Sequence, residues 1–285
     1  MSKFEKCKNA IIVANPYKSQ ARTKANSIKA FLEEEGVSSS IVFLDEYDKK
    51  FVENTQSDMV IALGGDGTML KVVHDFYILD VPFFGINNGH LGFITPYTKE
   101  NWMYGLKYYI EKKQVYSTRI LLSVVQKEKN KVIKSDIAVN EAYLHRPDSR
   151  AVIRVKAKIN NEVFASQLAA DGIIIATPTG STSYSMAAGA SVLSSEMNAF
   201  LFMPNNPFMA IDRALVFSSD NKIEISLDEH TKTDQGIIDI DGRYFNNFKR
   251  TDTIELSVAK EKVRIIKNPA LSEYERIGAK MSWKN

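Results

Sequence analysis

The chain has 285 residues, of which 44% are apolar and 25% charged, and its formal net charge is +3. This balance is typical of a globular protein of about two domains, and the small net charge without a basic block argues against nucleic acid as a partner. No apolar run is long enough to cross a membrane, so we expect no membrane partner. The single cysteine, Cys7, excludes an internal disulfide, and no signal-like apolar core follows Met1, so we expect a cytoplasmic location.

The first part of the chain alternates between strand and helix patterns. Short apolar runs predict four strands, at Ala10–Ala14, Ile41–Leu44, Met59–Leu63 and Pro82–Ile86. Apolar residues at helical spacing predict helices from Ala25 to Leu32, from Met69 to Leu79 and over Lys99–Lys112. This order predicts an α/β domain with a parallel sheet, in which ligands bind at the carboxyl ends of the strands.

The turn Gly64-Gly65-Asp66-Gly67-Thr68 joins the third of these strands to the next helix. We expect its glycines to adopt positive φ and to let a ligand approach, while the free N–H groups of the helix favour phosphate. Asp66 suits a group that takes a proton from an attacking hydroxyl or helps to hold a metal beside a phosphate. For an isolated motif, the alternative is a plain glycine turn in which Asp66 bonds its own backbone.

The second part of the chain is dominated by strand patterns and predicts an all-β domain. The domain boundary is expected near Gln114–Thr118, and the tail from Asn268, with Leu271, Tyr274 and Ile277 at helical spacing, predicts a closing helix. The expected strands are Ile120–Gln126, Ile137–Leu144, Val152–Ile159, Val163–Ser166, Ile173–Thr177, Ala214–Phe217, Ile223–Leu227, Ile237–Ile240 and Thr253–Val258.

Two polar features interrupt these strands. The stretch Thr177–Tyr184 is a dense hydroxyl loop that suits a ribose and an aromatic base, although a Ser/Thr-rich loop that caps a helix at Ser181 or Ser183 is the alternative for some of its hydroxyls. Asn140-Glu141 lies in an otherwise apolar strand, where buried polar groups need partners. This pair could read a base edge or a ribose diol, or it could simply face solvent on an edge strand.

The chain carries six motifs in this order: Gly64–Thr68, Asn87–Phe93, Asn140-Glu141, Asp171-Gly172, Thr177–Tyr184 and Asp241-Gly242. Taken together, these motifs strongly resemble NAD kinases. Lipid kinases and sugar kinases of the phosphofructokinase type share only the first motif, and the hydroxyl loop is the specific element. The resemblance implies transfer of a phosphoryl group from ATP to the 2′-hydroxyl of the adenosine ribose of NAD. It also implies an α/β domain, a β-sandwich-like domain, a tail that packs back on the first domain, and a homodimer or homotetramer.

The resemblance also assigns roles to individual residues. Asp66 would be the catalytic proton acceptor, and Mg²⁺ or another divalent cation would accompany ATP, with no metal ligands specified. Phosphate of ATP would be bound by Gly64, Gly65, Thr68, Asn87 and His90. NAD would be bound by Gly67, Phe93, Asn140, Glu141, Asp171, Thr179, Thr182, Ser183, Tyr184 and Ala187, with Asp171 at the nicotinamide end, where it could act across a subunit interface. The corresponding domains are 1–116 and 117–267, followed by the tail 268–285.

The chain departs from the family pattern after Tyr184. Ala187 stands where the family usually has a serine, and Gly189-Ala190-Ser191 stands where it has Gly-Gly-Pro, while Leu193–Asn206 is atypical. One hydroxyl contact to NAD is therefore lost, or replaced by Ser185. Neither a Gly-x-Gly-x-x-Gly motif after the first strand nor a Gly-Lys-Ser/Thr P-loop is present, which argues against a dehydrogenase and a Walker-type site. A lipid or sugar kinase, or an NAD-binding protein without catalysis, is the alternative function.

Overall fold

Two compact units make up the chain. One comprises residues 1–118 together with 261–285, and the other comprises residues 119–260. The structure, a computed structural model, describes residues 7–89, 92–111, 115–210 and 212–282. The expected division into domains at 116 and 267 stays a prediction, although the last residues of the chain do belong to the first unit. No helix in these described ranges is both long and apolar enough to span a bilayer.

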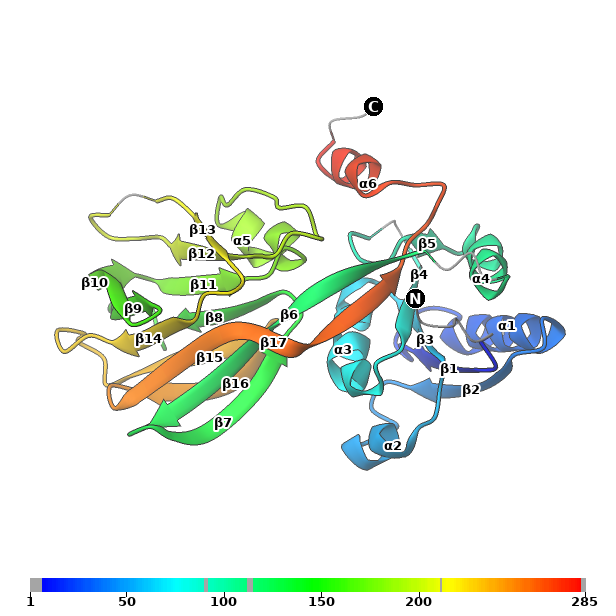
Figure 1. The fold of residues 1–285 in the computed structure, drawn as a ribbon, viewed down its shortest axis with the longest axis horizontal. Helices are drawn as coiled ribbons and strands as arrows, with labels where there is room; N and C mark the ends of the chain where they lie inside the picture. The colour runs from blue at the N-terminus through cyan, green and yellow to red at the C-terminus, as the bar shows by residue number, and fades with distance from the viewer. Residues whose placement is uncertain (1–6, 90–91, 112–114, 211, 283–285) are drawn as a thin grey trace. The chain divides into compact units, whose positions relative to one another are not determined.

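The first unit is built on a parallel sheet in the strand order β2-β1-β3-β4, which confirms the predicted fold class (Figure 1). All six residues of β3 and of β4 are buried, as expected for strands that are covered on both faces. The end of a later strand, β17, and the short β5 each pair in parallel with β4. The strands are β1 (Asn9–Ala14), β2 (Ser38–Phe43), β3 (Met59–Gly64), β4 (Pro82–Asn87) and β5 (Tyr97–Thr98).

Helices cover this sheet. α1 (Ala21–Glu34) and α4 (Trp102–Ile110) share a core with β1, β3 and β4, and α3 (Asp66–Phe76) packs against β3 and β4 and runs into the 3-10 turn η1 (Tyr77–Leu79). The helix α2 (Lys49–Asn54) was not predicted, because only Val52 is buried in its six residues and its N-terminus depends on a bond from Phe51 N to Asp48. α3 begins at Asp66, so this residue lies in the first helical turn rather than in the loop before it.

The strand order creates a crevice at the ends of β1 and β3. These two strands are neighbours, but the chain leaves β1 for β2 on one side and leaves β3 for β4 on the other. In open α/β sheets, ligands bind at such a switch point, outside the carboxyl ends of the strands. Asn15 follows β1 and Gly65 follows β3, and the N–H of Asn15 donates to the carbonyl of Leu63 at 3.1 Å.

The second unit is a sandwich of two largely antiparallel layers around one core, as predicted. The side chains of the core come from both layers, among them Leu144, Ile173 and Phe202 from one and Val155, Ile225 and Leu256 from the other. One layer has the order β13 (Leu215–Ser218), β12 (Ala199–Asn205), β11 (Gly172–Ala176), β8 (Glu141–His145), β15 (Gln235–Ile240), β16 (Arg243–Lys249). The other contains β10 (Glu162–Ala170), β9 (Ile153–Ile159), β14 (Ile223–Leu227), β17 (Asp252–Ile266), β6 (Tyr116–Glu128) and β7 (Lys131–Ala138).

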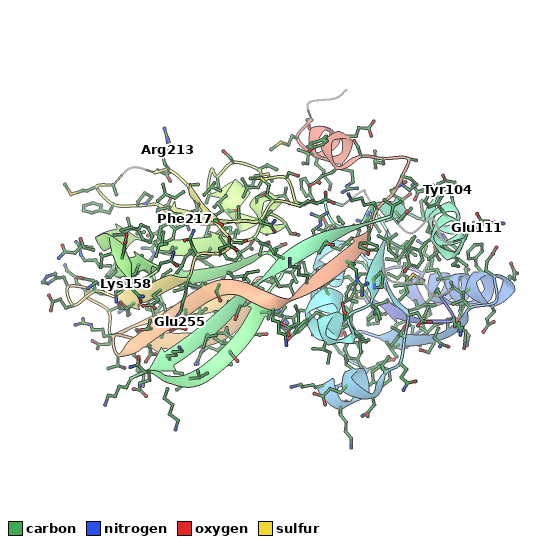
Figure 2. All side chains as sticks on the ribbon, viewed as in Figure 1. Tyr104, Glu111, Lys158, Arg213, Phe217 and Glu255 are labelled. Atoms are coloured by element: carbon green, nitrogen blue, oxygen red, sulfur yellow. The ribbon has the colours of Figure 1, made fainter. Side chains whose placement is uncertain are left out.

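Charged side chains form ion pairs on part of the second layer. Lys222 pairs with Glu255 at 2.9 Å and with Glu224 at 3.5 Å, and Lys127 pairs with Glu255 at 2.7 Å. Lys158 also approaches Glu224 at 3.9 Å, and Figure 2 shows Lys158 and Glu255 on this part of the molecule. These charges satisfy one another, so this surface does not suggest a ligand site.

The strands of the second unit differ from the predictions in three places: one expected strand is divided, and the two strands β12 and β16 were not predicted. The single strand expected over Ile137–Leu144 is divided between β7 and β8, which belong to different layers, and Asn140 lies at the break. The strand β12 was missed because Pro204 is a poor strand residue. Pro204 is accommodated because β13 pairs with β12 only as far as Phe202, so Pro204 lies beyond the part of β12 that is paired on both sides.

The chain ends in the predicted closing helix, α6 (Glu273–Lys280), which belongs to the first unit. A capping box between Ser272 and Glu275 fixes its start. The expected apolar face was wrong in part, because Tyr274 is 72% exposed while the buried positions of α6 are Arg276 and Gly278.

Candidate active site

The carboxylate of Asp66 is held by the segment that follows β4. Its Oδ2 accepts a hydrogen bond from the N–H of Phe93 at 2.7 Å, and its Oδ1 accepts from the N–H of Ile94 at 3.3 Å and from the hydroxyl of Thr95 at 2.7 Å. A carboxylate has about four lone-pair positions, so these three donors fix its orientation and leave Oδ2 with room for one more donor. The alternative in which Asp66 bonds its own turn backbone is therefore wrong.

Glycines near Asp66 provide space rather than unusual dihedral angles. The expectation of positive φ in Gly64, Gly65 and Gly67 is wrong, because the described glycines with positive φ are Gly36, Gly189 and Gly242. Instead, a Cβ on Gly92 would lie 2.0 Å from Asp66 Oδ1 and 2.1 Å from Thr95 Oγ1, so any side chain at this position would displace these two groups. Gly92 thus allows the loop to close on the carboxylate.

Two of the expected phosphate-binding residues support the frame of this site. The hydroxyl of Thr68 accepts from Asn15 Nδ2 at 3.1 Å, and Thr68 is buried, so this bond links the residue that follows β1 to the first turn of α3. Asn87 is also buried; its Nδ2 donates to the Thr95 hydroxyl at 3.0 Å, and its Oδ1 accepts from the N–H of Gly89 at 2.9 Å. Asn87 therefore positions the same threonine that contacts Asp66.

A cleft of about 520 Å³ opens beside this frame in the first unit. Three of its side chains are the lysines Lys18, Lys24 and Lys99, which sequence analysis missed because they come from separate segments. Lys24 donates to Asn88 Oδ1. The lining is Lys18, Ser19, Gln20, Lys24, Gly65, Asn87, Asn88, Gly89 and Lys99; Gly64 does not line it, and His90 lies outside the described residues. A neighbouring cleft of about 480 Å³ shares Lys24, Asn87, Asn88 and Lys99 and is otherwise largely apolar.

In the second unit, the break between β7 and β8 is held by the carboxylate of Asp241. It accepts from three successive backbone N–H groups, those of Val139 at 2.8 Å, Asn140 at 2.7 Å and Glu141 at 3.1 Å. The strand β8 pairs with β11 on one side and β15 on the other, so the alternative of an exposed edge strand is wrong. Asp241 therefore fixes the backbone of Asn140 and Glu141 at the start of β8, which is an interior strand of its layer.

Glu141 is buried with an incomplete set of partners. Its Oε1 accepts from the Ser183 hydroxyl at 3.0 Å, whereas its buried Oε2 has no hydrogen-bond partner among the described residues. Burial, together with the negative charge of Asp241, raises the pKa of Glu141 to about 7. The side-chain amide of Asn140, 8% exposed, likewise has no hydrogen-bond partner within the described ranges. An unmatched amide next to an unmatched carboxylate is suited to a polar ligand.

Most hydroxyls of the loop after β11 support the loop itself. The loop contains a short 3-10 turn, η2 (Gly180–Thr182), and one helical turn, α5 (Tyr184–Ala187). Gly180 packs so closely on Asn140 that an added Cβ would lie 2.2 Å from the Asn140 carbonyl oxygen. The side chains of Thr177, Ser181, Thr182 and Ser185 all donate to backbone carbonyl groups, at 2.6 to 3.2 Å.

Comparison with known proteins decides the family. Residues 45–114 match the ATP-NAD kinase N-terminal domain, and residues 139–268 match the ATP-NAD kinase C-terminal domain. A curated NAD kinase from Treponema denticola is 31% identical over 276 residues, which cover 97% of this chain and 96% of that protein. The chain belongs to the NAD kinase family.

Solved structures of the NAD kinase family share the fold. A yeast NADH kinase complexed with NADH gives a TM-score of 0.87 at 22% identity and covers 98% of this chain and 89% of its own. An NAD kinase from Archaeoglobus fulgidus in complex with ATP gives a TM-score of 0.75, also at 22% identity, over 97% of this chain and 100% of its own. The similarity to the relative from Treponema is not confined to the motifs between Gly64 and Gly242 but covers nearly the whole chain.

Some of the residues that the sequence predicted to bind NAD lie together in the structure, and others do not. Asn140, Glu141 and Ser183 lie next to one another, whereas Thr179 is buried in the loop and Ala187 is exposed at the end of α5. The expectation that Ser185 replaces the missing family serine is wrong, because its hydroxyl is fully buried and donates to the Gly180 carbonyl at 3.0 Å.

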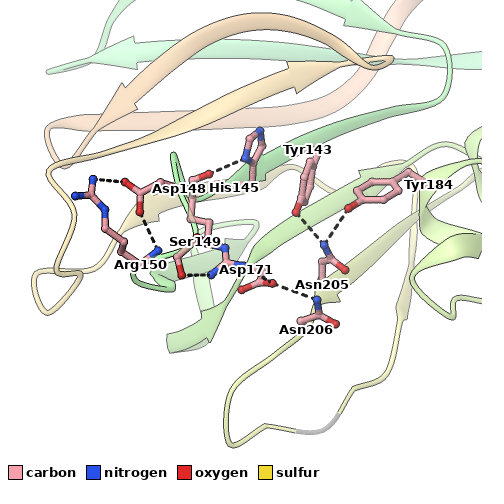
Figure 3. Close-up of polar contacts among 10 residues, drawn as sticks. Tyr143, His145, Asp148, Ser149, Arg150, Asp171, Tyr184, Asn205 and Asn206 are labelled. Atoms are coloured by element: carbon pink, nitrogen blue, oxygen red, sulfur yellow. Dashed lines mark hydrogen bonds and ion pairs between the residues drawn. The ribbon is translucent and has the colours of Figure 1, made fainter.

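Tyr184 and Asp171 belong to a polar surface that is shown in Figure 3. The amide of Asn205 donates to the hydroxyls of both Tyr143 and Tyr184, at 2.8 and 3.2 Å, and the two rings meet edge to face at 5.0 Å. Asn205 and Tyr143 were missed because they lie in interior strands without a motif. Asp171 accepts from Arg146 Nη2 at 3.0 Å and from a neighbouring asparagine, so its carboxylate is already engaged in an ion pair.

Proposed function

We propose that this chain transfers the γ-phosphoryl group of ATP to the 2′-hydroxyl of the adenosine ribose of NAD and so produces NADP. Membership of the NAD kinase family supports this reaction. The observation that carries its chemistry is the Asp66 carboxylate, which three donors hold at the first turn of α3 beside the switch point of the sheet.

Asp66 is the proposed general base, and Oδ2 is the proposed atom. Because Phe93 N–H is the one donor to Oδ2 among the described residues, this oxygen can accept the hydrogen bond of the ribose hydroxyl and then its proton. As the ribose oxygen attacks, its bond to the γ-phosphorus forms and the bond from that phosphorus to the β–γ bridging oxygen breaks, so that ADP leaves. Gly67, which is exposed in the first turn of α3, allows NAD to approach, and the half-buried Phe93 is proposed to pack on a base.

The phosphates of ATP are proposed to lie in the lysine-lined cleft of the first unit. Lys18 and Lys99 are exposed there, and Gly65 has no atom near the position of a Cβ, so the backbone is open to a phosphate oxygen. The free N–H groups at the start of α1 would favour the same anion. Phosphate contacts at Gly64, Thr68, Asn87 and His90 stay predictions; burial of Thr68 and Asn87 gives them a supporting role.

Mg²⁺ is proposed to enter with ATP. The described residues contain no group of three or more His, Cys, Asp or Glu side chains that could hold a metal by themselves. Phosphate oxygens of ATP and water would supply the ligands of Mg²⁺, and no carboxylate of this chain is assigned to it, because the one open position on Asp66 is assigned to the ribose hydroxyl. When bound, the cation would neutralise the charge that develops on the transferred phosphoryl group and on ADP.

NAD is proposed to be bound by the second unit through Asn140 and Glu141. Glu141 Oε2 would accept a ribose hydroxyl, and the Asn140 amide would read a base edge or a second hydroxyl, which would satisfy both orphan groups. Ser183 and Tyr184 stand beside them, and Thr179, Thr182 and Ala187 complete the proposed contact set. Asp171 is proposed for the nicotinamide end, where a ligand would have to share it with Arg146.

A homodimer or homotetramer is proposed as well, in which Asp171 could serve a neighbouring subunit. The edge strand β13 supports this proposal, because Leu215 and Val216 are 44% and 49% exposed, and Met209 nearby is 91% exposed. Edge strands with exposed apolar residues are favourable sites for association. Light scattering coupled to size exclusion measures the mass directly. A cytoplasmic location stays a prediction.

The reaction is tested with ATP, Mg²⁺ and NAD by measuring NADP, with diacylglycerol and fructose 6-phosphate as competing acceptors. Phosphorylation of either competitor without NADP formation would contradict the proposal. Lys18→Met tests the ATP cleft: we expect KM for ATP to rise roughly 5- to 20-fold, the worth of one charge-assisted contact, with KM for NAD unchanged. The control is Lys29→Met, on the same region of the chain but paired with Glu33 outside the cleft.

A further inference from the structure

A buried arginine lies in the C-terminal helix of the first unit. Arg276 is only 6% exposed. Within the described ranges its guanidinium forms no hydrogen bond and no ion pair, and its Nε is fully buried without a partner. A buried charge normally requires a partner, since leaving it uncompensated is costly. The proposed catalytic assignments do not use this side chain.

The segment before α6 is hydrogen-bonded to residues 96 and 97, which come directly after the residues that contact Asp66. The amide of Asn268, which is buried, donates to the carbonyl of Pro96 at 3.1 Å. The hydroxyl of Tyr97 donates to the carbonyl of Lys267 at 2.7 Å. These bonds join residues about 170 positions apart in the sequence and hold the tail against the 93–97 segment.

The helix itself turns one face towards Asp66. Lys280 Nζ lies 5.6 Å from the centre of the Phe93 ring, and the N–H of Phe93 is the donor to Asp66 Oδ2. Arg276 is four residues before Lys280, so the two cations lie on the same face of α6. The face that carries Arg276 therefore lies over the loop that holds the proposed base.

The electrostatic surroundings of Arg276 agree with this position. Burial lowers the pKa of the guanidinium, and the nearby carboxylates of Glu273 and Asp66, with the Tyr97 hydroxyl, act in the opposite direction. None of them is close enough for an ion pair with Arg276 among the described residues. Both oxygens of Asp66 already accept hydrogen bonds from residues 93–95, and the one open position on Oδ2 is assigned to the ribose hydroxyl. An anion from outside the chain would supply the missing partner.

We propose that Arg276 binds the phosphoryl group that is transferred at Asp66. The inference rests on the proposed function, which places a phosphate next to this carboxylate. The planar fork of N–H donors in a guanidinium matches two phosphate oxygens at once. Negative charge spreads over the three equatorial oxygens during transfer, so a fixed cation stabilises the transition state most strongly. Arg276 stays protonated throughout and contributes no proton.

Kinetics of three variants test the assignment. Arg276→Met removes the charge and keeps most of the length, Arg276→Lys keeps the charge without the fork, and Lys280→Met removes the exposed neighbouring cation as a control. We expect Arg276→Met to lower kcat by roughly 10²- to 10³-fold, at the lower end of effects for a phosphate-clamping arginine, with KM for NAD unchanged. Arg276→Lys should recover part of this loss, and Lys280→Met should stay within about twofold of the wild type.

Thermal unfolding separates a catalytic from a structural role. Because Arg276 is buried and has no partner in the part of the chain that the structure describes, Arg276→Met should match or exceed the melting temperature of the wild type. A fall in melting temperature that parallels the fall in kcat, or near-normal kcat in Arg276→Met, would overturn the proposal. If Arg276→Met does not fold, the comparison of Arg276→Gln with Arg276→Lys replaces it, and equal kcat in these two variants would overturn the proposal.

A binding measurement distinguishes failure of this proposal from failure of the proposed function. Inorganic tripolyphosphate should raise the melting temperature of the wild type and of Lys280→Met, and should do so much less for Arg276→Met. This readout does not depend on NADP formation. If the wild type makes no NADP, the proposed reaction is wrong, and the tripolyphosphate result still decides whether Arg276 is an anion-binding residue: equal shifts in all three proteins would overturn it.

Discussion

Replacing Glu141 by glutamine should change stability in a way that depends on pH. The pKa of Glu141 is raised from 4.5 to about 7 by burial and by the charge of Asp241. The folded protein therefore keeps a proton that the unfolded chain releases between these two values. By linkage, the stability that the neutral side chain provides is fully present below pH 4.5 and is lost as pH rises through about 7.

The shift sets the size of the effect. Two and a half pKa units correspond to roughly 3 kcal/mol, which is an upper estimate because part of the site relaxes when the charge forms. Glutamine keeps the shape and the acceptor oxygen for the Ser183 hydroxyl but cannot ionise. We therefore expect Glu141→Gln to equal the wild type near pH 4.5 and to be more stable by roughly 2–3 kcal/mol at pH 8.

Scanning calorimetry from pH 4.5 to pH 8 measures this difference. For a unit of this size, roughly 2–4 °C per kcal/mol gives a separation of roughly 4–12 °C at pH 8. Glu162→Gln, in the same unit but exposed on β10, is the matched control and should show no such divergence. A constant difference between Glu141→Gln and the wild type over the whole pH range would refute the reasoning, as would lower stability of the variant at pH 8.

Three further predictions concern the two halves of the site. Asp66→Asn should lower kcat by roughly 10²–10⁴-fold, the usual worth of a general base, with NAD affinity by calorimetry nearly unchanged; near-normal kcat would remove its role. Gly92→Ala should lower kcat and melting temperature together, because the new Cβ would lie 2.0 Å from Asp66 Oδ1, and a fully active variant would show that the loop is not closed as described. Ala187→Ser should tighten NAD binding by about 0.5–1.5 kcal/mol, since the buried Ser185 does not supply the missing hydroxyl; unchanged affinity would place NAD away from this position.

Much of the fold could be predicted because its signals are local. The four parallel strands are short apolar runs, and the turn at Gly64–Thr68 marks the end of β3 by composition alone. The apolar run Ile137–Leu144, in contrast, could not show by itself that β7 and β8 are separate strands. That break exists because the Asp241 carboxylate, about 100 residues further on, captures three consecutive N–H groups.

The site was predictable only where a motif lies in one stretch of chain. Asp66 and the pair Asn140-Glu141 were found in this way. The lysines of the cleft were missed because Lys18 and Lys99 are brought together only by the alignment of β1 with β4 through β3. The sequence also could not show which hydroxyls of the loop 177–184 and of Ser185 are structural. Thr177, Ser181 and Ser185 donate to backbone carbonyl groups, whereas Ser183 donates to the carboxylate of Glu141.

The C-terminal helix shows why a hydrophobic pattern can mislead at a functional position. Apolar spacing predicted a face containing Tyr274, yet Tyr274 is exposed and Arg276 is buried. A pattern of apolar residues assumes that burial is driven by hydrophobic area, and a buried charge contradicts that assumption. Such a charge is retained where it serves something other than stability. The proposed role gives such a reason: Arg276 lies over the segment that holds Asp66, and with no partner among the described residues its guanidinium is ready to bind a phosphate.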